Sequence, residues 1–434
     1  RFEVLLKLNS QTIQFDLVTR SRSYLDIVTY QLLVSELLKT TKDSEEIRRI
    51  ESELMTTTGL NRTLNTFPSA PIGTVYNVGV ILPEFDENDP DFTIPRNLYF
   101  GMVLAANDFN SRSIDQKVRL HFRNSAEDPD TTAKAFKELV WSKRADAVMG
   151  PLFSEPATRM ARLAEDYQIP MVAPLANSDD LNRDYIYTFQ LNPTFKIHGK
   201  EMARYAVQEL RLDTLAIITE SGSLGRASAL AFRHEAERLG AHISYYIEED
   251  FESSGYDFTE ITDVFTPNEE LIDSLNYKRS QAIYAPFTSE ASTTMMNLML
   301  NTLEGMRSDV IILGSEEWEF ADLTNFQERF FEIYYTKSFG ETDDQSALDY
   351  FEQDYETRFG IRPDRFSSLG YDAATYLFQS LERAGNPVYL ERALRNSPIQ
   401  NGLSMKIHFN GNRINQHLFI QPLSDLAKMR FNNR

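Results

Sequence analysis

The stretch DAVMGPLFSEPATRMARLAEDYQIPMVAPLANS, residues 146–178, contains the parts of one βαβ unit. The apolar run Ala147–Met149 predicts a buried strand that ends at the turn Gly150-Pro151. A helix is expected over Ser154–Tyr167 and a second buried strand over Met171–Ala173. Right-handed crossovers make two such strands parallel, so the loops that follow them lie at the same edge of the sheet. Because ligands of open α/β sheets bind at this carboxyl edge, we expect a binding cleft here.

The composition is that of a globular protein with more than one domain. The chain has 434 residues, more than one ordinary core accommodates. Its residues are 42% hydrophobic and 25% charged, as in globular proteins. Its 64 acidic residues against 44 lysines and arginines give a net charge of −20. Such a surface repels nucleic acid and anionic membranes, so neither is an expected partner. The chain contains no cysteine, which excludes disulfides, thiolate nucleophiles and cysteine metal sites.

Residues 1–66 differ in pattern from the rest of the chain. Apolar residues recur there at spacings of three and four with charged residues between them, which predicts amphipathic helices. We expect three helices, the last ending near Gly59, and one interpretation is the end of a helical repeat array. Pro68 and Pro71 mark a linker over residues 67–73. Because the first residue is Arg1 and no signal-peptide pattern follows, we expect a longer protein or a removed leader.

From Val75 onward, predicted strands alternate with predicted helices, which is typical of parallel sheets covered on both faces. Further strands are expected over Val78–Leu82, Val118–Phe122, Leu215–Thr219, His242–Ile247, Ala282–Ala285 and Val310–Leu313. Helices are expected over Leu98–Asn110, Thr131–Trp141, Lys196–Glu209, Arg226–Leu239, Phe258–Phe265, Thr293–Glu304, Gln345–Phe359 and Leu369–Ala384. Two similar α/β lobes are expected, because one open sheet with all these strands is uncommon. Asn410-Gly411, with alternating apolar and polar residues around it, predicts a final hairpin.

The motifs of catalysis are missing, so we expect no enzyme, no catalytic residue and no cofactor. The six histidines are scattered, and none has the helical-turn spacing of a metalloprotease site. Neither a Gly-x-Ser-x-Gly elbow nor a nucleotide-binding glycine motif follows a predicted strand. The acidic residues of the loop Glu84–Asp91 lack the glycine and closing glutamate of a calcium loop, so no metal is expected. Glu316 and Glu317 are adjacent and cannot flank a sugar bond, and first-turn acids after a Ser315 cap are their simplest interpretation.

Binding features are more informative. Ser154 lies where a helix begins after a strand, so its hydroxyl and nearby backbone N–H groups could receive a carboxylate. An ordinary serine cap is the alternative. Asn177 and Ser178 follow the next strand with the same two interpretations. Phe287 and Phe366 read from the residues alone as core aromatics.

The order of motifs resembles the type I periplasmic binding protein family, in particular the leucine, isoleucine and valine receptors of ABC transporters. The resemblance covers about residues 72–425. It is carried by Val78–Leu82, Ala105–Asn110, Asp128-Pro129, Gly150-Pro151, Ile169-Pro170 with Ala173-Pro174, Gly314–Glu316, Gly370–Ala373 and the final hairpin.

The resemblance implies two doubly wound parallel-sheet lobes that are joined by three crossovers and close on a ligand by hinge motion. Lobe 1 is expected over residues 74–192 and 338–402, and lobe 2 over 193–337 and 403–434. The crossovers are expected near Leu191–Thr194, Tyr335–Lys337 and Gly402–Lys406.

The resemblance also implies the ligand-binding residues. Ser154 stands where a hydroxyl of the family holds the ligand carboxylate, assisted by the segment Leu175, Ala176 and Asn177. Glu316 stands where an acid pairs with the ligand ammonium, and Phe287 and Phe366 where aromatic rings close over the ligand. Leu224 occupies the position of a family tyrosine, Asn177 that of a threonine, and the acidic PEFDENDPDFTIP replaces a short glycine-rich loop.

Two functions remain open at this stage. The first is a solute-binding receptor in the periplasm or at the cell surface that captures an amino acid or similar small polar ligand and works with membrane transporter subunits. The alternative is an envelope interaction protein that uses the same fold as a scaffold. Helical segments before this fold resemble the outer-membrane lipoprotein activators of peptidoglycan synthases, which implies a cell-wall synthase as partner and a lipid anchor ahead of Arg1.

Overall fold

The computed structural model describes residues 70–263, 279–340 and 344–432, together with the single positions 34, 37, 49, 50, 265 and 342. The chain divides into two compact units, Arg1–Pro68 and Ser69–Arg434, and the second unit is described below. The helices and the repeat array expected before Gly59 lie almost wholly outside the described residues. Within the described ranges, no helix is both long and apolar enough to cross a membrane.

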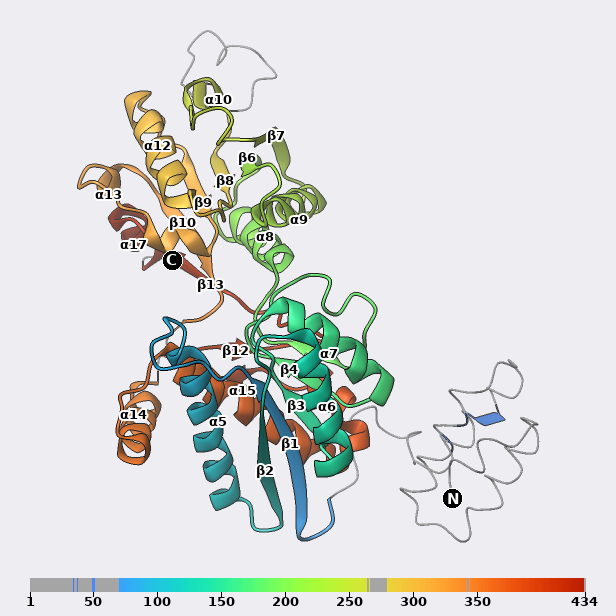
Figure 1. Ribbon diagram of the computed structural model, residues 1–434. Helices are drawn as coiled ribbons and strands as arrows, with labels where there is room; N and C mark the ends of the chain where they lie inside the picture. Colours follow the sequence, from blue (N-terminus) through green and yellow to red (C-terminus); the bar gives the residue numbers. More distant parts are fainter. Residues whose placement is uncertain are drawn as a thin grey trace. The chain divides into compact units, whose positions relative to one another are not determined.

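Lobe 1 is built on a sheet of five parallel strands in the order β2-β1-β3-β4-β5 (Figure 1). The strands are β1 Thr74–Leu82, β2 Gln116–Asn124, β3 Ala147–Met149, β4 Met171–Ala173 and β5 Thr188–Gln190. The helices are α5 Thr93–Arg112, α6 Pro129–Lys143, α7 Ser154–Tyr167, α14 Gln345–Phe359, α15 Arg365–Ala384, the 3₁₀ helix η3 Pro387–Tyr389 and α16 Leu390–Arg395. The short strands β11 Gln400–Asn401 and β12 Lys406–Ile407 pair antiparallel in a sheet of their own.

Lobe 2 is built on a sheet of six strands in the order β13-β10-β9-β8-β6-β7, all parallel except β13. The strands are β6 Thr214–Glu220, β7 His242–Glu249, β8 Ala282–Ala285, β9 Ile311–Gly314, β10 Ile333–Lys337 and β13 Phe419–Pro422. The helices are α8 Phe195–Arg204, its π-helical continuation η1 Tyr205–Glu209, α9 Gly225–Arg238, α10 Thr259–Asp263, α12 Ser292–Gly305, the 3₁₀ helix η2 Glu316–Phe320, α13 Gln327–Phe330 and α17 Asp425–Phe431.

Each sheet carries a core on both faces, because successive residues of a strand point to opposite sides. In lobe 1, Val80 packs with residues of α5 and α15, whereas its neighbour Ile81 packs with residues of α6 and α7. In lobe 2, Ile218 packs with α12, whereas Ile217 packs with α8 and α9. The two doubly wound lobes expected from the alternating pattern are therefore confirmed. The strands Ala147–Met149, Met171–Ala173 and Ala282–Ala285 and the helices Ser154–Tyr167 and Gln345–Phe359 have the predicted bounds.

Local sequence signals explain where two of the lobe 1 helices begin. Asp128 accepts a hydrogen bond from the Thr131 N–H at 2.6 Å, and Pro129 starts α6 at a position where a missing N–H has no cost. Asp364 accepts from the N–H of Ser367, whose hydroxyl in turn lies 3.1 Å from the Asp364 N–H. This capping box starts α15 four residues before the predicted start, Leu369.

The end of the chain differs from the predicted hairpin. Asn410 and Gly411 have positive φ angles of 49° and 79°, as an Asn-Gly turn requires, but the two arms do not pair as strands. β12 pairs with β11 and β13 with β10, and the Asn415 side chain instead accepts from the His408 N–H and donates to the Lys406 carbonyl. One backbone hydrogen bond, from the Gln416 N–H to the His408 carbonyl at 2.9 Å, joins the arms. The predicted hairpin is wrong beyond this contact, because the arms form strands with β11 and β10 instead.

Two of the three crossovers lie at other residues than predicted. Met405, Ile407 and Phe409 pack in the core of lobe 1, so the third crossover follows Phe409 and does not lie at Gly402–Lys406. The second runs from the end of β10 to the start of α14, after the predicted Tyr335–Lys337, which belong to β10. The first lies between β5 and α8, where it was expected.

Asp372, on the buried face of α15, holds the loop between β11 and β12. Its carboxylate accepts hydrogen bonds from the backbone N–H groups of Leu403 and Ser404 at 2.8 Å and of Met405 at 3.1 Å. A Cβ on Gly402 would lie 2.4 Å from the Asp372 carboxyl carbon, so the loop can approach the helix only with glycine there. Burial raises the pKa of Asp372 to about 6, although these hydrogen bonds act in the opposite direction.

We expect Asp372→Asn to lower the free energy of unfolding by about 3 kcal/mol at pH 8, because the amide offers one acceptor oxygen and turns N–H groups toward buried donors. Urea titration measures the change. Asp349→Asn on α14, whose carboxylate makes an exposed bond to Gln345, is the matched control and should change stability by less than about 0.5 kcal/mol. Equal losses in the two variants would contradict this role of Asp372.

Candidate binding site at the carboxyl edges of the two sheets

The strand order gives each lobe a switch point, where the chain leaves neighbouring strands in opposite directions. In lobe 1 the switch point lies between β1 and β3, and in lobe 2 between β6 and β8. The loops that follow these strands diverge at the carboxyl edge of the sheet, which is where ligands of open α/β folds bind. Ser154 follows β3, whereas Leu224 follows β6 and Phe287 follows β8.

Ser154 offers an unused hydroxyl in lobe 1. It is the first residue of α7, Phe153 stands at the N-cap, and no side chain caps the helix. Ser154 is thus not the N-cap of this helix, so the alternative interpretation as a serine cap is wrong. The Ser154 hydroxyl makes no hydrogen bond within the described ranges, and the first-turn N–H groups of α7 lack intrahelical acceptors. Gly150 makes the preceding turn possible, because it has φ +101° and a Cβ there would lie 2.0 Å from the Ile81 carbonyl oxygen.

The segment after β4 supplies one further free polar group. The Leu175 carbonyl accepts from the Asn192 side chain at 2.9 Å, and the Ala176 carbonyl accepts from the Gln190 side chain at 3.3 Å. Leu175 packs against the α5–α15 core and Ala176 lies in the α6–α7 core. The half-buried Asn177 side chain is not hydrogen-bonded to any described residue. Of these three predicted residues, Asn177 alone therefore presents a side chain suited to a polar ligand.

Phe366 lies in the first turn of α15 and is partly buried against the same core as Leu175. The guanidinium carbon of Arg365 lies 4.8 Å from the centre of the Phe366 ring. Phe366 thus belongs to the lobe 1 group by position, with one ring face next to a cation.

In lobe 2, a hydrogen bond connects the loops that follow β6 and β8. The Gly225 N–H donates to the Thr288 hydroxyl at 2.9 Å, and Leu224 just before it exposes 63% of its surface. Phe287 is fully buried, with its ring 5.9 Å from Phe251 and 6.1 Å from Phe258 between centroids. The Phe287 ring is therefore a core residue, which was the alternative considered from the sequence. Its carbonyl lies at the sheet edge and accepts from the Ser315 hydroxyl at 2.8 Å.

Glu316 follows β9 as the first residue of η2. Because the Ser315 hydroxyl is bonded to Phe287, Ser315 does not cap this turn with its side chain. The Glu316 carboxylate instead accepts the backbone N–H and the hydroxyl of Ser338, both at 3.2 Å. Burial raises the pKa of Glu316, and the two bonds from Ser338 oppose that rise.

Ser338 connects Glu316 to a buried histidine. His198 in α8 has its Nε2 3.1 Å from the Ser338 hydroxyl and its Nδ1 2.8 Å from the Thr336 hydroxyl. We call Glu316, Ser338 and His198 the hinge network, because Ser338 begins the second crossover and α8 follows the first. Sequence reasoning missed it: His198 is one of the six scattered histidines, and no local spacing signals a contact across 140 residues.

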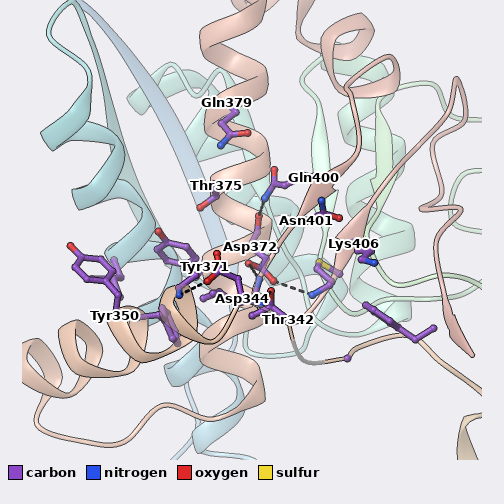
Figure 2. Close-up of a pocket in the computed structure, with 18 of the residues that line it drawn as sticks. Thr342, Asp344, Tyr350, Tyr371, Asp372, Thr375, Gln379, Gln400, Asn401 and Lys406 are labelled. Carbon is purple, nitrogen blue, oxygen red and sulfur yellow. Dashed lines mark hydrogen bonds between the residues drawn. The ribbon is translucent and has the colours of Figure 1, made fainter. Parts of the chain in front are cut away.

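The structure thus forms two groups of predicted site residues. Ser154, Asn177 and Phe366 lie in lobe 1, and Leu224, Glu316 and the backbone of Phe287 lie in lobe 2. A separate cavity of about 790 Å³ is lined by residues of α14 and α15 in lobe 1 and of β13 and α17 in lobe 2 (Figure 2). None of these predicted residues lines it.

Comparison with known proteins supports the fold. Residues 97–264 match the family model described as periplasmic binding protein. A crystal structure from Rhodospirillum rubrum, provisionally described as a branched-chain amino acid ABC transporter, aligns at 20% identity with a TM-score of 0.66, covering 81% of this chain and 98% of its own. A substrate-binding protein from Desulfitobacterium hafniense in complex with Leu aligns at 17% identity with a TM-score of 0.57, and the coverage of the two chains is the same.

A third structure carries a different ligand. It is an ABC transporter solute-binding protein from Rhodopseudomonas palustris BisB5 in complex with 3,4-dihydroxybenzoic acid, with 14% identity, a TM-score of 0.51, and coverage of 80% of this chain and 93% of its own. A comparison with curated protein sequences gives no match. At these identities the likeness to solved structures establishes the fold, and the expected resemblance is confirmed at that level.

The buried His198 predicts a pH dependence of stability. Burial lowers its pKa from 6.5 to about 4, so between these values the unfolded chain binds a proton that the folded chain does not. Its contribution to stability is present above pH 6.5 and is lost as the pH falls toward 4, by about 3 kcal/mol in total. Urea midpoints from pH 4 to pH 8 measure this, with His198→Asn as the reference variant that does not titrate.

The comparison with the variant is needed because carboxyls with raised pKa values, Glu316 among them, act in the opposite sense. The pKa values of Asp146 and Asp372 are raised to about 6, so their contribution is present at low pH and is lost as the pH rises through 6. Asp146 and Asp372 are unchanged in His198→Asn, so their contributions cancel in the difference between the two profiles, which reports on the hinge network that contains His198. Parallel profiles would contradict the assignment.

Proposed function

We propose that this chain, which has the type I periplasmic binding protein fold, is an extracytoplasmic solute-binding protein that captures a small polar ligand between its lobes. The observation that supports this most is the pairing of unlike groups at the two switch-point edges. Lobe 1 offers the free Ser154 hydroxyl at a helix N-terminus, and lobe 2 offers the Glu316 carboxylate. A ligand that has both a carboxylate and an ammonium group, such as an amino acid, matches these two ends.

The lobe 1 end suits a carboxylate. The 14-residue helix α7 directs its first N–H groups and the positive end of its dipole toward the loop after β3. Ser154 adds a hydroxyl donor, and Asn177 adds an amide after the neighbouring strand β4. A carboxylate bound there would satisfy groups that otherwise face water.

The lobe 2 end suits a cation. Burial raises the pKa of Glu316, and an ammonium next to it would favour its ionised form. The same carboxylate is bonded to Ser338 at the start of the second crossover. A ligand on Glu316 would therefore act on the segment that must bend when the lobes close.

A second candidate function is the interaction scaffold, and specific observations favour it. Glu316 already has two donors from Ser338, the Phe287 ring fills the core, and Leu224 exposes an apolar side chain at the lobe 2 edge. These features reduce the polar groups available to a ligand. Arg1–Pro68 also forms a unit separate from the fold, as an interaction module would. In this case the partner would be an envelope protein such as a cell-wall synthase.

The solute-binding proposal predicts that at least one amino acid raises the unfolding temperature of the intact chain, because ligand that binds only the folded state stabilises it. Leucine, other amino acids, short peptides and 3,4-dihydroxybenzoate are the probes. Ser154→Ala and Glu316→Gln should each weaken the effective ligand by about tenfold or more, the cost of one charge-assisted hydrogen bond. Calorimetric titration measures the affinity.

Glu317→Gln is the matched control, because Glu317 is the next residue and its carboxylate has no part in the Ser338 bonds. It should leave the affinity within about twofold. Binding of the dihydroxybenzoate alone would support a solute-binding protein but contradict the ammonium site at Glu316. No shift with any probe would contradict the proposal as a whole.

The scaffold alternative predicts that a purified peptidoglycan synthase binds the intact chain and that binding is lost when the chain begins at Ser69. Surface plasmon resonance with both forms measures this. Equal binding of the two forms, or a strong ligand shift with no synthase binding, would favour the receptor.

A further inference from the structure

The second crossover is attached to lobe 2 as far as Ser338. Lys337 ends β10, where it pairs with Phe419 of β13, and its Nζ forms an ion pair with Glu319. Ser338 follows directly, is buried, and donates its N–H and its hydroxyl to the Glu316 carboxylate, both at 3.2 Å. Because strand pairing and a carboxylate hold this backbone, it moves with lobe 2.

Gly340, two residues later, is attached to lobe 1. Its N–H donates to the Ser404 carbonyl at 2.9 Å. Ser404 lies in the loop between β11 and β12, and its own N–H donates to the Asp372 carboxylate at 2.8 Å. Asp372 belongs to α15, which packs in the core of lobe 1. Through Asp372 and Ser404, α15 therefore holds the crossover at Gly340.

The peptide between Ser338 and Phe339 lies between these two attachments. Neither the Ser338 carbonyl nor the Phe339 N–H makes a hydrogen bond to any residue that the structure describes. The Phe339 ring packs against the core formed by β1, α5 and α15, so this side chain follows lobe 1. Hinges are a few residues that absorb a change of backbone angles, and this peptide is the place where such a change breaks no hydrogen bond.

The first crossover is equally short. The Asn192 side chain donates to the Leu175 carbonyl of lobe 1 at 2.9 Å. Thr194, two residues later, is the N-cap of α8, and its carbonyl accepts the Ile197 N–H at 2.9 Å. Pro193 lies between them, and its ring fixes φ near −65°. This crossover thus allows rotation about few angles.

The third crossover passes beside the second. The Gln416 N–H donates to the His408 carbonyl of lobe 1 at 2.9 Å, and Phe419 already pairs with β10 in lobe 2. His417 and Leu418 lie between these attachments. All three crossovers therefore change from one lobe to the other within one or two residues.

The cavity of about 790 Å³ gives the lobes room to move next to this passage. Phe419 and Phe431 line it from lobe 2, and Tyr350 and Thr375 line it from lobe 1 (Figure 2). Gly340 lines it as well, and a Cβ there would lie 3.2 Å from the Phe419 ring. Because packed cores resist deformation, a cavity at this place lets β13 and α17 move relative to α14 and α15 at low cost.

We propose that lobe movement bends the second crossover at the peptide between Ser338 and Phe339, and that Glu316 and Asp372 confine the bend to this peptide. The inference rests on the proposed function, because capture of a solute requires the lobes to close. It makes Asp372 a positioning residue of the hinge, which acts through Ser404. A ligand bound to Glu316 would act one residue away from the bend.

The test compares glycine with alanine at this peptide. Phe339→Gly and Phe339→Ala both remove the ring from the lobe 1 core, but only glycine frees the backbone angles. Spin labels at Lys137→Cys on α6 and His234→Cys on α9 report the distribution of distances between the lobes by double electron–electron resonance, without ligand. Because the three crossovers act in parallel and one is freed, Phe339→Gly should broaden this distribution about 1.3-fold or more relative to Phe339→Ala.

Lys337→Gly and Lys337→Ala are the matched control pair, because pairing with Phe419 restricts the backbone of both variants. Their two distributions should coincide. If the Phe339 variants do not fold, Ser338→Gly with Ser338→Ala tests the same peptide. Coincident distributions for glycine and alanine at the tested position, or equal broadening by Lys337→Gly, would overturn the proposal.

The role of Asp372 has a readout other than stability. Asp372→Asn weakens the attachment of Gly340 to lobe 1, so it should broaden the distribution of the labelled chain. Asp349→Asn on α14, whose carboxylate makes an exposed bond to Gln345, should leave the distribution unchanged. An unchanged distribution in Asp372→Asn would overturn the positioning role of Asp372.

These measurements contain no ligand, so they fail separately from the proposed function. Broadening in Phe339→Gly without affinity for any solute in calorimetric titration would support this hinge and contradict solute binding. Affinity for a solute with coincident distributions in the glycine and alanine variants would support solute binding and overturn this hinge.

Discussion

The hydrogen bonds between Glu316 and Ser338 are the constraint on which the arrangement of lobe 2 and its connections depends. The carboxylate receives the only hydroxyl proton of Ser338, so the His198 Nε2 at 3.1 Å must donate to the same hydroxyl. A neutral histidine then has its Nδ1 free to accept from Thr336. Burial, which lowers the pKa of His198 to about 4, keeps it in this neutral form at physiological pH. Each hydroxyl or ring proton of the network thus has one acceptor. Through Ser338 and His198, the network joins the loop after β9 to the start of the second crossover and to α8, which follows the first.

This network also relates the two proposed functions. If Glu316 receives a ligand ammonium, its bonds to Ser338 must share the carboxylate oxygens with the ligand, and any change is passed to the second crossover. If no ligand binds, the same bonds hold the crossover in one conformation and the fold serves as a rigid scaffold. The two functions therefore differ in whether the Glu316 carboxylate accepts a third hydrogen bond, from a ligand. Its two oxygens have about four lone-pair sites, which is enough for a third donor.

Much of the fold could be predicted from the sequence, because apolar runs and Gly-Pro punctuation act locally. The unit around Ala147–Met149 and Ser154–Tyr167 was correct to the residue for this reason. The site was harder. A phenylalanine gives the same signal in a core and over a ligand, so Phe287 could not be assigned, and the partners of Glu316 come from residues distant in sequence. Asn410-Gly411 specified the turn, but the strands on either side pair with β11 and β10, whose positions no local pattern contains. Whether Ser154, Asn177 and Glu316 meet on one ligand stays a prediction.

Closure of the lobes on a ligand is the central claim, and the distance between the lobes tests it most directly. Because the chain has no cysteine, Lys137→Cys on α6 and His234→Cys on α9 would carry the only two spin labels. Double electron–electron resonance then gives the distribution of distances between the two spin labels. We expect a broad distribution without ligand and a narrower one at shorter distance when a bound amino acid is added, with no such change in a Glu316→Gln background. A distribution that stays the same at saturating ligand would contradict hinge closure.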